Sequence, residues 1–196
     1  MTQNPARSAP GTATVRRVRP ADAARVRALR LEMLADAPLA FLETLADAAA
    51  RPHAEYAARI AYTSRGSHTA QFVAEPQDHP GDHAGDHPAG GRGDRRGHRL
   101  VGHAGGVAAA DEPDVTVVFA VYVTPTWRGT GLLADLVDGV GAWSRACGRP
   151  QLMLEVVVGN DRAYRAYRRL GFTDTGIRVP HPTIPALWEL QMRRAA

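Results

Sequence analysis

The sequence contains no lysine, only one cysteine and few aromatic residues. Since Cys147 has no possible partner within the chain, an internal disulfide framework is excluded, and we expect a reducing, cytoplasmic environment. No apolar run reaches the roughly 20 residues that a membrane-spanning helix needs, so we expect no membrane partner. All 24 basic residues are arginine, and the formal net charge is +4.

A positive net charge favours acidic ligands or nucleic acid as partners. The arginines are scattered along the chain, however, and aromatic residues make up only 6% of it. A nucleic-acid interface usually gathers basic side chains into a stripe or patch. We therefore do not expect nucleic acid to be the main partner.

Composition divides the chain into a short N-terminal tail and one α/β domain that contains an inserted segment. We expect residues 1–11 to be a flexible N-terminal tail and residues 12–196 to form the domain. Residues 77–99 are rich in Gly, Pro, Asp, Arg and His without apolar periodicity, which predicts a disordered loop inserted between two strands. The loop carries three Asp-His pairs, but its Pro and Gly prevent the helix that would align them, so we expect no metal site.

Strand and helix patterns alternate through the rest of the domain. A helical stripe of Val26, Leu29, Met33 and Leu34 follows a half-buried strand, and the nearly continuous apolar run at 151–158 predicts a strand buried on both faces. Strands are expected within 12–20, 70–76, 100–111, 115–123, 151–158, 171–176 and 186–194, and helices within 21–34, 37–64 (broken near Arg51-Pro52), 132–147 and 161–170.

The segment VYVTPTWRGTGLL, residues 121–133, places a glycine-bearing turn between a strand and a helix. Such a turn leaves backbone N–H groups free at the positive end of the helix dipole, which favours an anion such as phosphate. The alternative is that the turn needs glycine for steric reasons alone. The turn is not a Walker loop, because no Gly-Lys-Ser/Thr follows.

A single carboxylate, Glu155, interrupts the apolar run at 151–158. Burial disfavours the charged form of a carboxyl group, so we expect the pKa of Glu155 to rise toward neutrality, as in a general base. The alternative is a Glu at a strand edge or end that is held by an ion pair. The residues alone leave both interpretations open.

One face of the predicted helix at 161–170 carries Ala163, Tyr167 and Leu170, which are four and then three residues apart. Tyr167 is therefore expected to point inward. By itself it is best interpreted as an aromatic core residue. Beside an anion site and a Glu with a raised pKa, its phenol becomes a candidate proton donor.

These motifs and their order resemble the GNAT superfamily of N-acetyltransferases. Residues 121–133 are similar to its acetyl-CoA-binding motif, a strand followed by Arg/Gln-x-x-Gly-x-Gly/Ala, and residues 160–172 to its next motif, Asn-x-x-Ala-x-x-x-Tyr-x-x-x-Gly-Phe. The resemblance extends over about 15–194, apart from the predicted insert. One departure is Leu133, which replaces the last small residue of the first motif and either crowds the pyrophosphate or points into the seam between helix and sheet.

The resemblance implies a mixed, strongly twisted sheet of six or seven strands with helices on both faces, and acetyl-CoA as co-substrate without a metal. It places the pantetheine arm along Val121, Tyr122 and Val123 and near Asn160, and the pyrophosphate over Arg128, Gly129, Thr130, Gly131, Leu132, Leu133 and Ala134. Tyr167 is implied to protonate the leaving thiolate. The order Leu154-Glu155-Val156, Asn160, Tyr167 also looks like that of ribosomal-protein alanine N-acetyltransferases, in which the Glu serves in proton removal.

The implied function is transfer of an acetyl group to a primary amine, either a small molecule or a peptide or protein N-terminus, by direct attack. Tyr56, His181 and Trp188 are candidates for lining the acceptor pocket, although core or rim packing is the default interpretation of each. A homodimer is possible on the pattern of the family. The alternative function is a non-catalytic acyl-CoA-binding sensor or scaffold, which would keep the turn but not the chemistry of Glu155 and Tyr167.

Overall fold

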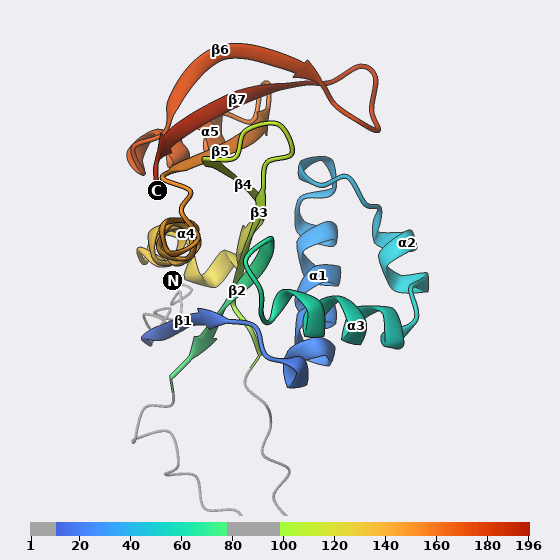
Figure 1. Cartoon of the computed structure of the whole chain (residues 1–196). Helices are drawn as coiled ribbons and strands as arrows, with labels where there is room; N and C mark the ends of the chain where they lie inside the picture. Colours follow the sequence, from blue (N-terminus) through green and yellow to red (C-terminus); the bar gives the residue numbers. More distant parts are fainter. Residues whose placement is uncertain (1–10, 78–98) are drawn as a thin grey trace, which may run out of the picture.

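A seven-stranded mixed sheet with strand order β1-β2-β3-β4-β5-β7-β6 organises the computed structural model of the chain, which describes residues 11–77 and 99–196 (Figure 1). The predicted tail and insert, with the three Asp-His pairs, fall almost wholly outside the described residues. The elements in chain order are β1 (Ala13–Arg17), η1 (Pro20–Asp22), α1 (Ala23–Asp36), η2 (Pro38–Ala40), α2 (Leu45–Ala50), α3 (His53–Thr63), β2 (Thr69–Pro76), β3 (Gly102–Ala108), β4 (Val115–Val123), η3 (Pro125–Trp127), α4 (Leu132–Ala146), β5 (Gln151–Val157), α5 (Asp161–Arg169), β6 (Thr173–Pro180) and β7 (Trp188–Ala195).

Helices cover both faces of the sheet, as predicted. Figure 1 shows α1, α2 and α3 on one side of the central strands and α4 on the other. The helical stripe read from the sequence in α1 is buried, and Val26, Leu29 and Met33 pack with Ile60 of α3 and Val73 of β2. Within the described residues, no helix is both long and apolar enough to cross a membrane.

The second core lies under α4 and α5. Leu136, Val137 and Val140 of α4 are fully buried against strand residues that include Leu152 and Leu154 of β5. Strands β4 and β5 are parallel, which requires a crossover connection, and α4 supplies it. All the other strand pairs are antiparallel.

The prediction that the strand at 151–158 is buried on both faces is wrong. In β5, Leu152, Leu154 and Val156 are buried, whereas Gln151 and Glu155 are exposed. The apolar run conceals this alternation because Met153 and Val157 are only half-buried. The buried face of β5, with Leu152, Leu154 and Val156, belongs to the core under α4.

Candidate functional site

Strands β4 and β5 start as neighbours and then diverge. They pair over three positions only, Val115–Val117 with Gln151–Met153, although β4 has nine residues and β5 seven. Beyond these pairs, the facing backbone groups of the two strands have no ladder between them. A ligand with amide groups of its own can occupy such a gap by pairing with the strand backbone.

A β-bulge in β4 lies at the start of the divergent part. The pairing with β3 runs from Gly105 opposite Phe119 to His103 opposite Tyr122, so that two residues of β4 face one residue of β3. The bulge contains Ala120, which has φ of 50° and is the one non-glycine residue of positive φ among the described residues. Bulges bend a strand and are common beside active sites.

A cavity of about 620 Å³ occupies the gap between the two strands. Its wall takes residues from β4, β5, α5, the turn before α4, and the C-terminal end of α1. Three predicted residues, Val121, Tyr122 and Val123, line it from β4. The ring of Tyr122 itself packs in the core beneath α1, where its hydroxyl donates a hydrogen bond to Glu32 over 3.3 Å.

The predicted phosphate turn closes one side of the cavity. Gly129 and Gly131 have φ of 84° and 93°, a conformation that favours glycine, and α4 begins directly after them. Within the described part of the chain, the backbone N–H groups of residues 129–133 donate to no backbone or side-chain acceptor. A Cβ added to either glycine would meet no atom within 4 Å, so the space above the turn is open.

The guanidinium of Arg128 does not point freely into this space. Its Nε donates to the carbonyl of Val123 over 3.0 Å, and its other nitrogen pairs with the carboxylate of Asp36 at the end of α1. Arg128 therefore ties the turn to the ends of β4 and α1. Arg128 lines the cavity together with two further arginines, Arg162 and Arg169 of α5.

The other predicted residues of the turn divide into two groups. Leu133 and Ala134 line the cavity. Leu133 also packs against the core under α4, at the seam between helix and sheet, which was one of the two positions that the sequence allowed for it. Leu132 is buried in that core, and the hydroxyl of Thr130 donates to the carbonyl of Trp127 over 2.8 Å. Neither Leu132 nor Thr130 has a side chain on the cavity wall.

Tyr167 of α5 also lies on the cavity wall. It packs against the core under α5, and its ring meets Phe172 edge-on with the ring centres 5.7 Å apart. Burial raises the pKa of Tyr167 to about 12. The phenol is therefore protonated at neutral pH, as a proton donor must be.

Glu155 reaches the same cavity from β5 but is not buried. Of the two interpretations that the sequence left open, the apolar environment is therefore wrong, because Glu155 is exposed. Asn160 also lines the cavity, and its side chain accepts a hydrogen bond of 3.2 Å from the N–H of Ala163, so that it caps α5. The structure thus brings Glu155, Asn160 and Tyr167 to one cavity with the turn.

The sequence model of the acetyltransferase (GNAT) family matches residues 49–172 of the chain. The matched segment contains the turn, the bulged strand, Glu155 and Tyr167. The chain belongs to the GNAT acetyltransferase family. The resemblance stated from the two motifs is therefore confirmed, and so is the mixed α/β fold.

One curated relative is the aminoglycoside N(6')-acetyltransferase type 1 of Stenotrophomonas maltophilia. The chain is 37% identical to it over 54 residues, which is 28% of this chain and 35% of the relative. The match therefore spans about a third of that protein's length.

Solved structures of GNAT proteins share the fold. An acetyltransferase of the family from Streptococcus pneumoniae has a TM-score of 0.66 at 16% identity, with 94% of this chain and 99% of that one covered. NAA60 of Arabidopsis thaliana, solved with acetyl-CoA, has a TM-score of 0.66 at 15% identity over 94% and 98% of the two chains. YncA of Salmonella typhimurium, also solved with acetyl-CoA, has a TM-score of 0.62 at 20% identity and covers 94% of each chain.

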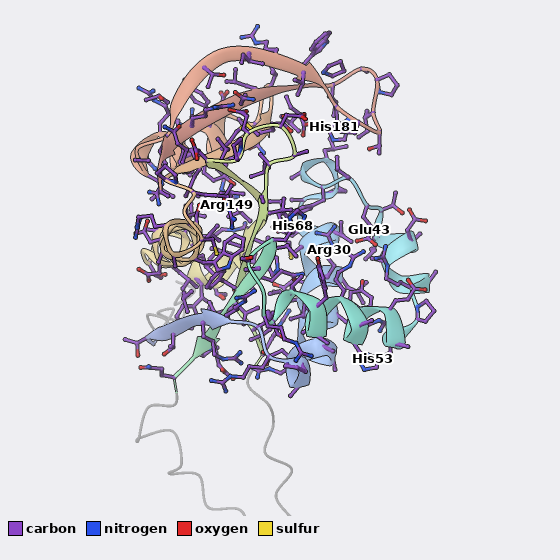
Figure 2. The ribbon with its side chains drawn as sticks, in the orientation of Figure 1. Arg30, Glu43, His53, His68, Arg149 and His181 are labelled. Carbon is purple, nitrogen blue, oxygen red and sulfur yellow. The ribbon has the colours of Figure 1, made fainter. Side chains whose placement is uncertain are left out.

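The GNAT fold places the three predicted acceptor residues away from the cavity wall. Tyr56 is buried, and its hydroxyl donates to the carbonyl of Ala48 in α2 over 3.2 Å. Trp188 is exposed at the start of β7. His181 is buried at the end of β6 (Figure 2), where its Nδ1 accepts from the N–H groups of Thr183 and Ile184.

A second carboxylate in the cavity escaped the sequence analysis. Glu189 of β7 is half-buried on the wall, and its pKa is raised, first by burial and then by the charge of Glu155. Strand pairing explains the proximity, because Glu155 faces Gln191 and Val157 faces Glu189, which puts both carboxylates on one face of neighbouring strands. The only signal for Glu189 in the sequence is the alternation of apolar and polar residues along β7. This alternation does not reveal which strand pairs with β7.

Proposed function

We propose that the protein is an acetyl-CoA-dependent N-acetyltransferase that acts on a primary amine. One observation carries the proposal: a splayed pair of parallel strands opens beside a turn of unpaired N–H groups, and Tyr167 stands in the same cavity. The gap suits an amide-bearing arm, and the turn suits a pyrophosphate. The residues present therefore fit acetyl-CoA.

The charges around the cavity suit the two reactants. Arg162 and Arg169 of α5 and the N–H groups of the turn favour the phosphates of the co-substrate. Glu155 of β5 and Glu189 of β7 favour an ammonium group. Acetyl-CoA supplies an activated acyl group on a thioester, and CoA leaves as a thiolate.

In the proposed reaction, Glu155 takes one proton from the incoming ammonium group, directly or through a water molecule. The free amine forms the new C–N bond as the C–S bond breaks. A backbone N–H of β4 stabilises the charge that develops on the acyl oxygen. The nitrogen loses its second proton to solvent as the amide forms, and Tyr167 gives its proton to the departing sulfur and regains one from solvent. Glu155 then releases its own proton, so that one acetylation releases one proton in all.

The acceptor is tested with purified protein, acetyl-CoA and a panel of amines. The panel contains aminoglycosides, because a relative carries that activity in its name, together with polyamines and peptides with a free N-terminus. Mass spectrometry identifies an acetylated product directly. Binding of acetyl-CoA without transfer to any acceptor would instead support the acyl-CoA sensor.

Replacing Glu155 with Gln should lower kcat about 10- to 30-fold and leave the Kd of acetyl-CoA unchanged. The effect is modest for a general base because Glu155 is exposed, so that solvent can accept the proton in its place. The matched variant is Glu189→Gln, which removes the neighbouring charge and should lower kcat less. Equal kcat for wild type and Glu155→Gln, with a loss in Glu189→Gln, would assign the base to Glu189.

Replacing Gly131 with Ala should raise the Kd of acetyl-CoA roughly tenfold and lower the free energy of unfolding by about 1 kcal/mol. The conformation at φ of 93° strains an L-residue, and the new methyl group would stand in the open space above the turn. Gly66 is the matched control, since it has φ of 85°, equally open surroundings and a place outside the cavity wall. In calorimetry, equal losses of affinity in both variants would contradict a phosphate-binding role for the turn.

A further inference from the structure

A chain of buried polar contacts runs from β2 through β3 to the bulge in β4. His103 of β3 is buried, with its Nδ1 2.7 Å from the carbonyl oxygen of Ala120 and its Nε2 2.9 Å from Oε1 of the Gln71 side-chain amide. Gln71 of β2 is also buried. The backbone hydrogen bonds of the strands do not involve the His103 ring. The imidazole therefore adds a separate restraint on the carbonyl group of Ala120.

That carbonyl belongs to the strained residue of the bulge. Ala120 has φ of 50°, a conformation that a residue with a Cβ adopts only when its surroundings hold it there. The neighbouring Phe119 adds a second restraint, because its ring lies only 2.3 Å from where a Cβ of Gly105 would be. The glycine on β3 thus makes room for the ring, and the histidine on β3 binds the carbonyl.

The protonation of His103 follows from its partners. A carbonyl oxygen only accepts, so Nδ1 carries the proton and donates to Ala120. Burial lowers the pKa of His103 to about 4, so the imidazole is neutral and Nε2 is an acceptor. An accepting Nε2 cannot face the accepting Oε1, so the Gln71 amide is assigned the flipped orientation, in which its NH₂ group donates to Nε2.

The peptide bond that follows Ala120 transmits this restraint to the cavity. In a trans peptide, the carbonyl of one residue and the N–H of the next point in opposite directions. The structure has no cis peptide bond among its described residues, and the Ala120 carbonyl is turned toward His103 on β3. The N–H of Val121 therefore points away from His103, and Val121 lines the cavity between β4 and β5.

We propose that His103 is a positioning residue for acetyl transfer, which holds the bulge so that the N–H of Val121 is aimed at the developing oxyanion. The proposal rests on the proposed function, since the oxyanion forms only if acetyl transfer occurs. His103 touches neither reactant and acts through the Ala120–Val121 peptide. Gln71 fixes the orientation of the His103 ring through its contact with Nε2.

Two substitutions of His103 separate this role from simple core filling. His103→Asn places an amide nitrogen near the position of Nδ1 and keeps a donor for Ala120. His103→Gln reaches the position of Nε2, keeps a partner for Gln71 and loses the donor. We expect kcat to fall tenfold or more in His103→Gln but to stay within about threefold of wild type in His103→Asn.

The Kd of acetyl-CoA should stay within about threefold in both variants, because the turn and α5 hold the phosphates. Thermal melting is measured for both as well. If kcat follows the melting temperature across the variants, or if Asn and Gln lower kcat equally, His103 is a structural residue and the proposal is wrong. His68, which is exposed, supplies the control variant His68→Gln.

A measurement on the wild type tests the hydrogen bond without turnover. With ¹⁵N-labelled histidine, NMR should show His103 neutral from pH 5.5 to 8 with the proton on Nδ1, and the signal should be missing in His103→Gln. A proton on Nε2 would overturn the proposal. If the wild type shows the expected tautomer but acetylates no amine, the proposed function is wrong, and so is the catalytic role of His103. If the wild type is active but carries the proton on Nε2, only the inference about His103 is wrong.

Discussion

Replacing Tyr167 with Phe should lower kcat for acetyl transfer about 100- to 1,000-fold and leave the Kd of acetyl-CoA within about threefold. Burial raises the pKa of Tyr167 to about 12, so the phenol keeps its proton until a strong base forms beside it. A thiolate released into the same desolvated cavity is such a base, because desolvation also disfavours its charged form. Phenylalanine preserves the ring contact with Phe172 and removes only the donor.

Tyr164 provides the matched control for this experiment. It lies on the same helix and packs against the same core, but it is not part of the wall of the large cavity. Tyr164→Phe should leave kcat within about twofold of wild type. Single-turnover kinetics with saturating acetyl-CoA would measure the chemical step, and full activity of Tyr167→Phe there would exclude Tyr167 as the acid.

Replacing Phe172 with Ala should lower the free energy of unfolding by about 3–5 kcal/mol. Phe172 is 1% exposed and is the last residue of the motif at 160–172, which contains α5. Its ring meets Tyr167 edge-on and lies 5.2 Å from the guanidinium carbon of Arg194 in β7. The substitution therefore opens a cavity at the point where α5 is fixed to the sheet, and it leaves Tyr167 without its neighbour.

Urea unfolding of Phe172→Ala and of the surface variant Ile177→Ala would measure this effect. Ile177 is 49% exposed, so its variant should change the free energy of unfolding by no more than about 0.5 kcal/mol. A loss below 1 kcal/mol for Phe172→Ala would show that the Gly-Phe end of the motif does not anchor α5. A large loss with normal kcat in the folded protein would show that Phe172 does not position Tyr167.

Local patterns determined the elements and the two motifs of the protein. The stripe Val26, Leu29, Met33 in α1 and the glycines of the turn act over a few residues, through helical periodicity and through a conformation that favours glycine. Asn160 likewise caps α5 through a contact within its own helix. Each of these features could be read from the sequence, because the interacting groups are neighbours along the chain.

Only the tertiary structure decided the environment of the reactive groups. Glu155 lies beside the gap because β5 loses its neighbour β4 after Met153, and Glu189 lies near it because β7 pairs with β5. The bulge at Ala120 depends on Gly105 and His103 of another strand. Strand register joins residues that are tens of positions apart, and no local pattern specifies that register. The sequence by itself therefore determined which residues the protein has for its chemistry. The pairing of strands decided what surrounds those residues.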